Sequence, residues 1–328
     1  MIKIEKLLNI DDKIFVAGHN GMVGKSVCRS LKKKGYNNVI TCERKKLDLE
    51  ISSDVDDFIN ENKPKVVVLA AAKVGGIYAN NKFPGDFILN NLRIQTNLIK
   101  SSWNFNVKRF LFLGSSCIYP KLSKQPIKEE YLLTGSLEET NEYYAIAKIA
   151  GLKLCEALKK QYGFDSISLM PTNLYGTGDN YDPQTSHVLP ALIRKFCEAK
   201  NNNYKSVTCW GDGSPLREFL HCNDLGDACV YSLENINSEV LRKVNNSSID
   251  YLSHINIGTG LDISIKKLAE IIAKEVGFEG EIIWDLNKPN GTPQKKLDVN
   301  LINKLGWNHK ISLINGLRST IKEFQNTD

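Results

Sequence analysis

A glycine-rich turn between an apolar strand and a helix is the feature that most limits what this chain can fold into. The predicted strand is Lys13 to Ala17, the turn is Gly18-His19-Asn20-Gly21-Met22-Val23-Gly24, and the predicted helix runs from Met22 to Lys34 before Gly35. Glycine lets a backbone approach a pyrophosphate closely, and a helix N-terminus offers free amides and the positive end of a dipole. The order of strand, Gly-x-x-Gly-x-x-Gly turn and helix therefore favours a dinucleotide-binding βαβ unit.

The first half of the chain repeats this alternation of strands and helices. We expect further strands at Asn38 to Thr41, Val66 to Ala70, Arg109 to Gly114 and Ser166 to Met170, and helices at Asp86 to Trp103 and Tyr144 to Tyr162. Residues 66–70 are apolar throughout, which is typical of a parallel strand that is covered on both faces. The pattern predicts an α/β Rossmann fold, which is a doubly wound parallel sheet.

The sequence becomes richer in turns after Pro171, at residues 176–183, 211–215 and 289–293. Apolar residues between Ile265 and Val276 recur at helical spacing and predict one buried helix face. We expect a smaller, mixed α/β C-terminal substrate lobe here. The predicted division is a Rossmann domain over 1–172, to which 216–232 and 253–260 return, and a second lobe over 173–328.

Composition excludes several other classes of protein. The longest wholly apolar run among the 328 residues is Val66 to Ala72, far shorter than the roughly 20 residues of a membrane span, and the start of the chain is unlike a secretory signal. The eight cysteines include no Cys-x-x-Cys pair and the five histidines are dispersed. We therefore expect free thiols, no metal and a cytoplasmic location. The net charge of +6 is interspersed, which argues against a nucleic-acid binder.

Three polar residues, Ser115, Tyr144 and Lys148, are candidates for one catalytic group. Tyr144 and Lys148 are four residues apart on a predicted helix and so lie on one face. A lysine cation there is expected to stabilise the phenolate, lower the pKa of the tyrosine and hold the nicotinamide ribose. Ser115 follows the strand Arg109 to Gly114 at the sheet edge where α/β proteins bind ligands, so its hydroxyl can bind a substrate ketone.

The choice of cofactor depends on the charges after the second strand. Glu43 lies where an acid grips the adenosine ribose of NAD, whereas Arg44-Lys45-Lys46 beside it can neutralise the 2′-phosphate of NADP. On electrostatic grounds the sequence favours NADPH.

These elements, in this order, resemble the extended short-chain dehydrogenase/reductase superfamily, and finer segments resemble the GDP-L-fucose synthase family within it. The segments lie at 17–24, 70–77, 113–126, 141–154, 170–175, 186–188, 210–221 and 253–260, and the run Phe112 to Lys121 is highly specific. The resemblance covers nearly the whole chain. It implies an NADPH-dependent enzyme that epimerises C3 and C5 of a GDP-4-keto-6-deoxy sugar and reduces its C4 ketone.

The resemblance also implies roles for single residues. Ser115, Tyr144 and Lys148 match the reductase triad of the family, while Cys117 and His187 match the base and the acid of epimerisation. The residues that it assigns to the GDP-sugar are Ser116, Cys117, Asn173, Lys195, Trp210, Arg217 and Lys295. Those that it assigns to the cofactor are Gly18, Asn20, Gly21, Met22, Val23, Gly24, Arg44, Ala71, Leu113, Gly114, Ser115, Tyr144, Lys148, Pro171, Asn173, Leu174 and His187.

Three positions depart from the family pattern. Lys195 takes the place of an arginine, Asn290 replaces a usual aspartate, and Asn20 stands where a second arginine for the 2′-phosphate is common. Structural roles also remain open for two residues, because His187 precedes an apolar helix that it can cap, and Trp210 can be a core aromatic. A thiolate at Cys117 is a good base only where positive charge lies beside it.

Four functions remain as alternatives on this fold. The first is the full epimerase-reductase, and the second is a C4 reductase that acts only on a related GDP-4-keto sugar, such as a 6-deoxy-heptose for capsule synthesis. An epimerase that retains NAD is disfavoured by Arg44-Lys45-Lys46 and Cys117, and a dinucleotide-sensing regulator would not need Ser115, Tyr144 and Lys148 together. A homodimer is expected through the helices Asp86 to Trp103 and Tyr144 to Tyr162.

Overall fold

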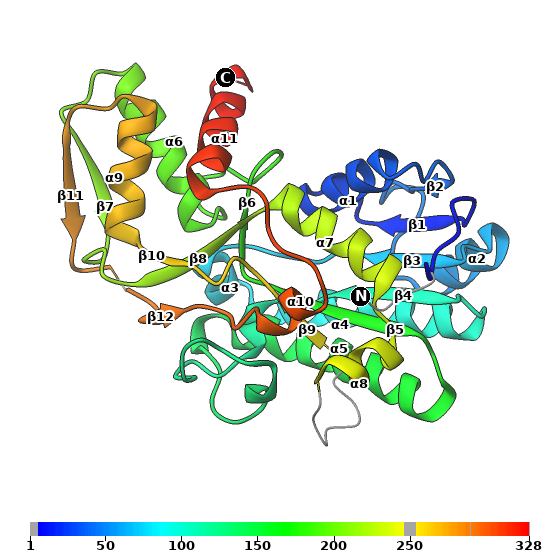
Figure 1. The fold of residues 1–328 in the computed structure, drawn as a ribbon. Coiled ribbons are helices and arrows are strands. Elements are labelled where there is room, and N and C mark those ends of the chain that lie inside the picture. Colours follow the sequence, from blue (N-terminus) through cyan, green and yellow to red (C-terminus); the bar gives the residue numbers. More distant parts are fainter. Residues whose placement is uncertain (1–5, 246–253, 289, 328) are drawn as a thin grey trace.

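A six-stranded parallel sheet forms the larger lobe of the computed structural model, which describes residues 6–245, 254–288 and 290–327 (Figure 1). Its strand order is β2-β1-β3-β4-β5-β9. The strands are β1 (Ile14–Ala17), β2 (Val39–Ile40), β3 (Val66–Leu69), β4 (Arg109–Leu113), β5 (Ser166–Pro171) and β9 (His254–Ile257). All neighbours pair in parallel, so their carboxyl ends share one edge, where a ligand site is expected.

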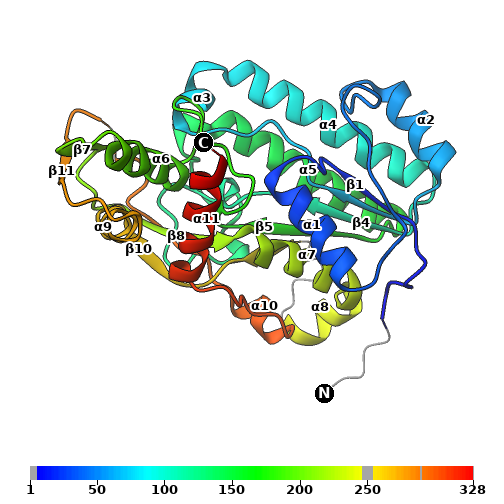
Figure 2. The same ribbon diagram turned by 90° about the horizontal axis from the view of Figure 1, so that it is seen from above.

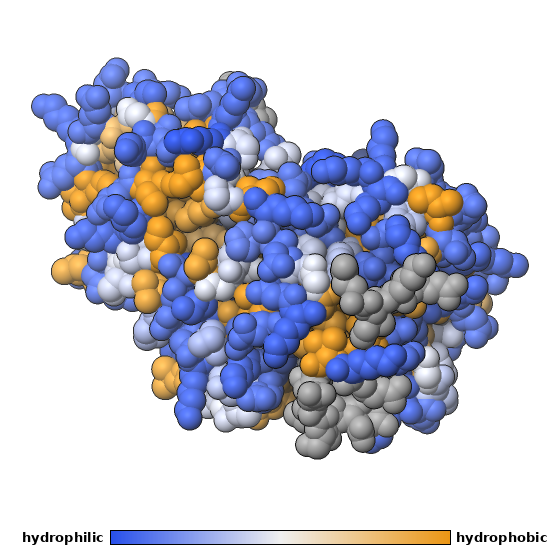
Figure 3. Space-filling view, viewed as in Figure 1, coloured by the Kyte–Doolittle hydropathy of each residue, from blue (hydrophilic) through white to orange (hydrophobic). Residues whose placement is uncertain are grey.

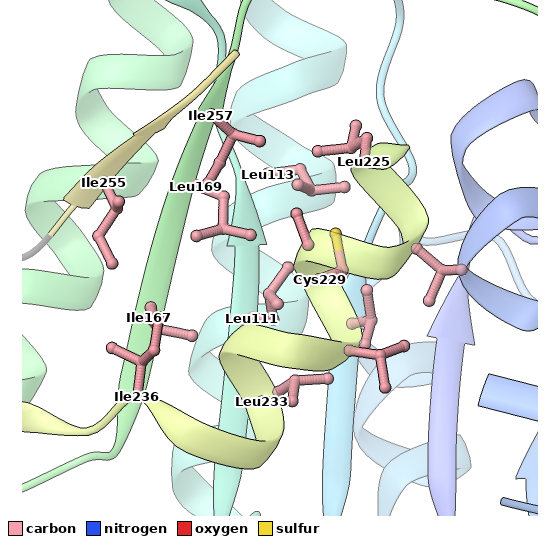
Figure 4. Close-up of a cluster of buried hydrophobic side chains, with 14 of the residues drawn as sticks. Leu111, Leu113, Ile167, Leu169, Leu225, Cys229, Leu233, Ile236, Ile255 and Ile257 are labelled. Carbon is pink, nitrogen blue, oxygen red and sulfur yellow. The ribbon is translucent and has the colours of Figure 1, made fainter. Parts of the chain in front are cut away.

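Helices cover both faces of this sheet. In Figure 2, α2 (Ser52–Asn62), α4 (Pro84–Asn104) and α5 (Glu142–Tyr162) lie on one side of the strands, and α1 (Met22–Lys33) and α7 (Cys222–Asn235) lie on the other. The alternation of side chains along each strand fills both interfaces. On β4, for example, Leu111 packs towards α7 in the core cluster of Figure 4, whereas Phe110 and Phe112 belong to the cluster on the opposite face. The predicted doubly wound sheet is thereby confirmed.

The smaller lobe is built around the strand β8 (Leu216–His221). This strand pairs with β6 (Asn173–Tyr175) and β12 (Gln294–Lys295) in parallel and with β10 (Asp262–Ser264) antiparallel. A second pair, β7 (Ser206–Trp210) with β11 (Glu281–Asp285), lies beside α6 (Val188–Asn201) and α9 (Ile265–Val276). Their apolar faces and α11 (Leu313–Thr327) enclose a separate core.

Short elements complete the fold. They are α3 (Ile77–Lys82), α8 (Ser238–Asn245), α10 (Asn300–Lys304) and three short 3-10 helices, η1 (Ser116–Ile118), η2 (Glu129–Tyr131) and η3 (Glu139–Asn141). The chain crosses between the lobes several times: β8 belongs to the sheet of the smaller lobe, whereas the next helix, α7, and later β9 lie with the larger sheet. The predicted domain limits stay a prediction, and Ser253 and Pro289 lie outside the described residues.

Most of the expected elements occur near their predicted limits. The helix expected from Tyr144 begins two residues earlier, at Glu142, and both it and α1 end where Gly163 and Gly35 take a positive φ. The helix α2 was not expected from the sequence. Within the described ranges no helix is long and apolar enough to cross a membrane, and no group of His, Cys, Asp and Glu is arranged to hold a metal.

The surface and the cysteines agree with the composition. Hydrophilic residues dominate the face seen in Figure 3, and apolar side chains gather in patches between them. All eight cysteines are free thiols, and five of them, from Cys155 to Cys229, are buried.

The contact between α1 and α7 generates a stability prediction. A Cβ on Gly226 of α7 would lie 2.4 Å from the Ser26 hydroxyl and 2.7 Å from the Ser26 backbone. We therefore expect Gly226→Ala to lower the free energy of unfolding by about 1–3 kcal/mol, because the two helices must move apart. Urea unfolding followed by circular dichroism measures it. The matched control is Gly85→Ala on α4, where nothing lies within 4 Å of the added Cβ; equal loss in both variants would contradict the packing argument.

Candidate active site

The glycine turn after β1 forms a tight cradle at the start of α1. Gly18 has a φ of +86°, and a Cβ on it would lie 2.6 Å from the backbone of Ala71, at the end of β3. A Cβ on Gly24 would lie 2.1 Å from the Gly18 carbonyl oxygen, so this position also requires glycine. The α1 helix begins at Met22 after the N-cap Gly21, which leaves its first amides free for an anion. The cradle fits a dinucleotide pyrophosphate, and the roles of Asn20 and Val23 in holding it stay a prediction.

The arginine expected to bind a 2′-phosphate lies beyond β2 and is already ion-paired. The side chain of Arg44 is 76% exposed, and its guanidinium is 2.9 Å from a Glu50 carboxylate oxygen and 3.9 Å from Asp48. Asn90 of α4 donates to the same Glu50 carboxylate. Glu50 therefore restrains the Arg44 side chain, a contact that the sequence analysis missed.

The serine, tyrosine and lysine of the predicted triad come together at the end of β4. Ser115 caps η1 by accepting a hydrogen bond from the Cys117 amide at 3.2 Å, and its side chain also bonds to Tyr144. Lys148 lies one turn further along α5, 5.8 Å from the centre of the Tyr144 ring, and donates to the Leu113 carbonyl at 2.9 Å. Gly114 follows β4 just before Ser115, and a Cβ on it would require the Met170 side chain to move.

Burial acts on the two titratable groups of this triad in opposite directions. It raises the pKa of Tyr144 well above the usual range of a phenol, assisted by the nearby Cys117 and opposed by the Ser115 hydrogen bond. It lowers the pKa of Lys148 to about 8. The expectation that Lys148 lowers the pKa of Tyr144 is therefore wrong for this structure, because desolvation of the phenolate dominates. Tyr144 is a protonated phenol at neutral pH, which suits a proton donor.

A thiol pocket adjoins the triad. The Cys117 sulfur lies 3.5 Å from the Asn141 amide nitrogen and 3.3 Å from the Lys295 ammonium, and these three residues line one cavity with Ser116 and Glu138. Asn141 comes from the start of α5 and Lys295 from β12, about 150 residues later in the chain. The structure thus supplies the positive charge beside Cys117 that the sequence analysis required but did not identify.

His187 stands at the N-cap of α6 without making a capping hydrogen bond from its side chain. Its surface is accessible, but the surrounding protein lowers its pKa, and the Lys295 cation acts in the same direction. The capping role considered from the sequence is therefore wrong. The imidazole faces the same charged group as Cys117, which brings both proposed proton-transfer residues to one region.

The remaining predicted substrate residues form two groups. Arg217 of β8 lies directly opposite Lys295 in the β8–β12 register, beside the thiol pocket. Trp210 lies at the end of β7 and is 54% exposed, with the ammonium groups of Lys195 and Lys288 5.9 Å and 5.4 Å from its ring. Trp210 is therefore no core aromatic, and it offers an accessible ring flanked by cations.

The other predicted cofactor residues lie at the carboxyl edge of the large sheet or in β6 of the smaller sheet. Ala71 follows β3, Leu113 ends β4 and Pro171 ends β5. Leu174 lies in β6. Asn173 donates to the Glu218 carbonyl at 2.8 Å, which fixes the first residue of β6 against β8.

Glu218 is a structural residue of the site that the sequence analysis did not single out. It is 0% exposed, and its carboxylate accepts backbone hydrogen bonds from Thr259 at 2.5 Å, Gly260 at 2.8 Å and Leu297 at 2.7 Å. Burial raises its pKa, and these hydrogen bonds oppose that shift. One feature of the sequence could have identified Glu218. It is an acid that directly precedes the apolar pair Phe219-Leu220 in a strand, at a position where a residue is normally buried.

Comparisons with known proteins agree with this fold and site. The model of the NAD dependent epimerase/dehydratase family matches residues 14–250. GDP-L-fucose synthase 1 of Arabidopsis thaliana is 53% identical, covering 94% of this chain and 91% of its own, and GDP-L-fucose synthase of Escherichia coli K12 is 50% identical, covering 95% and 96%. A crystal structure of a GDP-6-OMe-4-keto-L-xylo-heptose reductase from Campylobacter jejuni superposes with a TM-score of 0.90 at 38% identity, covering 98% of this chain and 99% of that one. A GDP-mannoheptose C4 reductase from Campylobacter jejuni with NADP bound gives a TM-score of 0.87 at 39% identity, covering 97% and 99%.

The Rossmann sheet, the glycine cradle and the Ser-Tyr-Lys group define an NADP-dependent oxidoreductase of the short-chain dehydrogenase/reductase type. The chain belongs to the NAD dependent epimerase/dehydratase family and, within it, to the GDP-L-fucose synthase family. The resemblance seen in the sequence is confirmed.

The lowered pKa of Lys148 predicts how cofactor binding depends on pH. The ammonium is present below about pH 8 and is lost above it, so a ribose contact made by the charged form weakens as the pH rises. We expect the Kd for NADPH to rise by up to about tenfold between pH 7 and pH 9, measured by titration calorimetry. Lys148→Arg keeps its charge and should remove this dependence. A Kd that is constant over that range in the wild type would contradict the assignment.

Proposed function

We propose that this enzyme epimerises C3 and C5 of a GDP-4-keto-6-deoxy sugar and then reduces its C4 ketone with NADPH, as a GDP-L-fucose synthase does. The observation that carries the proposal is the thiol pocket beside the triad: Cys117 lies two residues after Ser115, within contact of the Asn141 amide and the Lys295 ammonium. The names of the relatives at about 50% identity support the same substrate class.

Epimerisation uses the acidity that a C4 ketone gives to the hydrogens on C3 and C5. Ser115 and Tyr144 donate hydrogen bonds to the ketone oxygen and so stabilise the enolate that forms when a proton leaves. The Cys117 thiolate takes that proton from one face of the sugar, and His187 gives a proton to the other face. The carbonyl is then restored with the carbon inverted.

Reduction uses the same oxygen-binding groups. NADPH supplies the hydride that C4 receives. Tyr144 donates its phenolic proton to the C4 oxygen, and its raised pKa keeps that proton in place at neutral pH until it is needed. The Lys148 ammonium, one turn away, holds the cofactor ribose and offsets the negative charge left on the tyrosine.

A second candidate function is C4 reduction alone, on a related GDP-4-keto heptose. It is favoured by the similarity to the solved GDP-heptose reductases, at TM-scores of 0.90 and 0.87. In that case Cys117 and His187 would bind the sugar without exchanging its protons.

We further propose a cytoplasmic homodimer. The eight free cysteines fit a reducing compartment. Leu89 of α4 and Tyr143 and Ile146 of α5 are exposed apolar side chains on the two helices expected at the dimer interface, and a second copy would cover them.

The role of Tyr144 generates the first functional prediction. Tyr144→Phe removes the phenolic proton but leaves Lys148 and the glycine cradle intact. We expect the reduction rate to fall at least a thousandfold while the Kd for NADPH changes by less than about threefold. Stopped-flow absorbance of NADPH with a GDP-4-keto-6-deoxy hexose measures the rate. Turnover like that of the wild type would defeat the assignment.

The role of Cys117 generates a second prediction, which separates the two candidate functions. In D₂O, the wild type should incorporate deuterium at C3 and C5, and Cys117→Ser should lose that incorporation while still reducing C4. NMR of the products from hexose and heptose substrates measures it. Cys28→Ser, at a half-buried thiol on α1, is the matched control. Reduction without any deuterium uptake by the wild type would favour the C4 reductase.

A further inference from the structure

We propose that Lys295 is a positioning residue for Cys117, which holds the sulfur as a thiolate and aims it at the sugar. The inference rests on the proposed function, because it explains how Cys117 acts as the base. It differs from the nucleotide-contact role that the family resemblance implies for Lys295. The ammonium is 3.3 Å from the sulfur, which is within the distance of a hydrogen bond to sulfur.

Two side chains from distant parts of the chain contact the Cys117 sulfur. The Asn141 amide at 3.5 Å comes from the start of α5, and the Lys295 ammonium comes from β12 of the smaller lobe. Both groups donate and neither accepts from a thiol in this geometry, so both favour the deprotonated sulfur. A cation in contact with a cysteine is also the usual means by which proteins stabilise a thiolate.

The backbone around Lys295 is fixed on both sides. β12 pairs with β8 at Lys295 and Arg217. The next residue, Lys296, donates its amide to Gln125 at 2.9 Å, and the amide of Leu297 binds the buried Glu218 carboxylate at 2.7 Å. A lysine side chain is long and flexible, so this anchoring restricts where its ammonium can reach.

Other titratable groups lie near Cys117, but the charged group in contact with its sulfur is Lys295. Tyr144 of α5 is protonated, and Arg217 of β8 acts on Cys117 electrostatically from the adjacent strand. Glu138, the acid that lines the cavity, is engaged by the Lys121 ammonium at 3.1 Å and by the Thr292 hydroxyl at 3.2 Å. Lys295 is therefore the cation in direct contact with the sulfur.

One ammonium thus biases both proton-transfer groups. Beside Cys117 it favours the anion that accepts the proton of C3 or C5. Desolvation lowers the pKa of His187, the Lys295 cation adds to that shift, and a lower pKa makes the protonated imidazole a stronger donor. The protons balance: the substrate loses one to sulfur and gains one from His187, and solvent restores both residues.

Alkylation of Cys117 without substrate tests the inference independently of the enzymatic activity. The rate of iodoacetamide reaction at Cys117 is followed by peptide mass spectrometry between pH 5.5 and pH 9. In Lys295→Met we expect the rate at pH 7 to fall at least tenfold and the whole profile to move to higher pH, and in Lys295→Arg we expect the wild-type profile. Lys124→Met, at an exposed lysine, and alkylation of Cys28 are the controls. An unchanged Cys117 profile in Lys295→Met would overturn the inference.

Deuterium uptake at C3 and C5 supplies the kinetic test. If Lys295 acts through Cys117, Lys295→Met lowers kcat for exchange at least tenfold and changes KM for the GDP-sugar by less than about threefold, and Lys295→Arg restores exchange. A raised KM with an unchanged kcat would instead identify a nucleotide contact and overturn the inference. If Lys295→Met shifts alkylation but the wild type takes up no deuterium, the epimerase function fails and the thiolate contact stands.

Discussion

A single buried carboxylate joins the parts of the chain that carry the site. Glu218 has no exposed surface, and its side chain binds backbone amides after β9 and β12, while its own carbonyl accepts from Thr172 and Asn173. A buried acid is stable only where hydrogen bonds replace its water, so each of these segments must be in place at once. The edge of the large sheet and the strand that carries Lys295 are therefore locked to β8. Because of these hydrogen bonds, β12 lies where Lys295 can contact Cys117.

Burial in the site then shifts the pKa of each titratable group in a direction set by the charge of its ionised form. Burial raises the pKa of Tyr144 and lowers that of Lys148, because in each case the charged form loses its water. The phenol keeps the proton that reduction requires. The Lys148 ammonium donates a hydrogen bond to the Leu113 carbonyl. Near these two residues, the Cys117 sulfur is in contact with the Lys295 ammonium and the Asn141 amide nitrogen.

Local patterns in the sequence predicted much of this arrangement. The glycine spacing predicted the cradle, since only glycine fits where Gly18 and Gly24 approach other backbone. The four-residue spacing of Tyr144 and Lys148 predicted that they share a helix face, and α5 has that form. The exposure of Trp210 and the contact of Lys295 with Cys117 were harder to predict, because neither property leaves a local signal in the sequence. The reversed pKa shift of Tyr144 was missed for a related reason, since desolvation depends on what covers the phenol from other segments.

By itself, the sequence determined the class of fold, the cofactor cradle and the members of the Ser-Tyr-Lys group. These depend on periodicity, on glycine geometry and on the order of strands and helices, all of which act over short stretches of chain. Only the tertiary structure decided which cation meets Cys117, how Glu218 joins the lobes and which way burial moves each pKa. Those properties arise between residues that are far apart in the chain, where electrostatics and desolvation depend on the packed neighbours and no spacing rule applies.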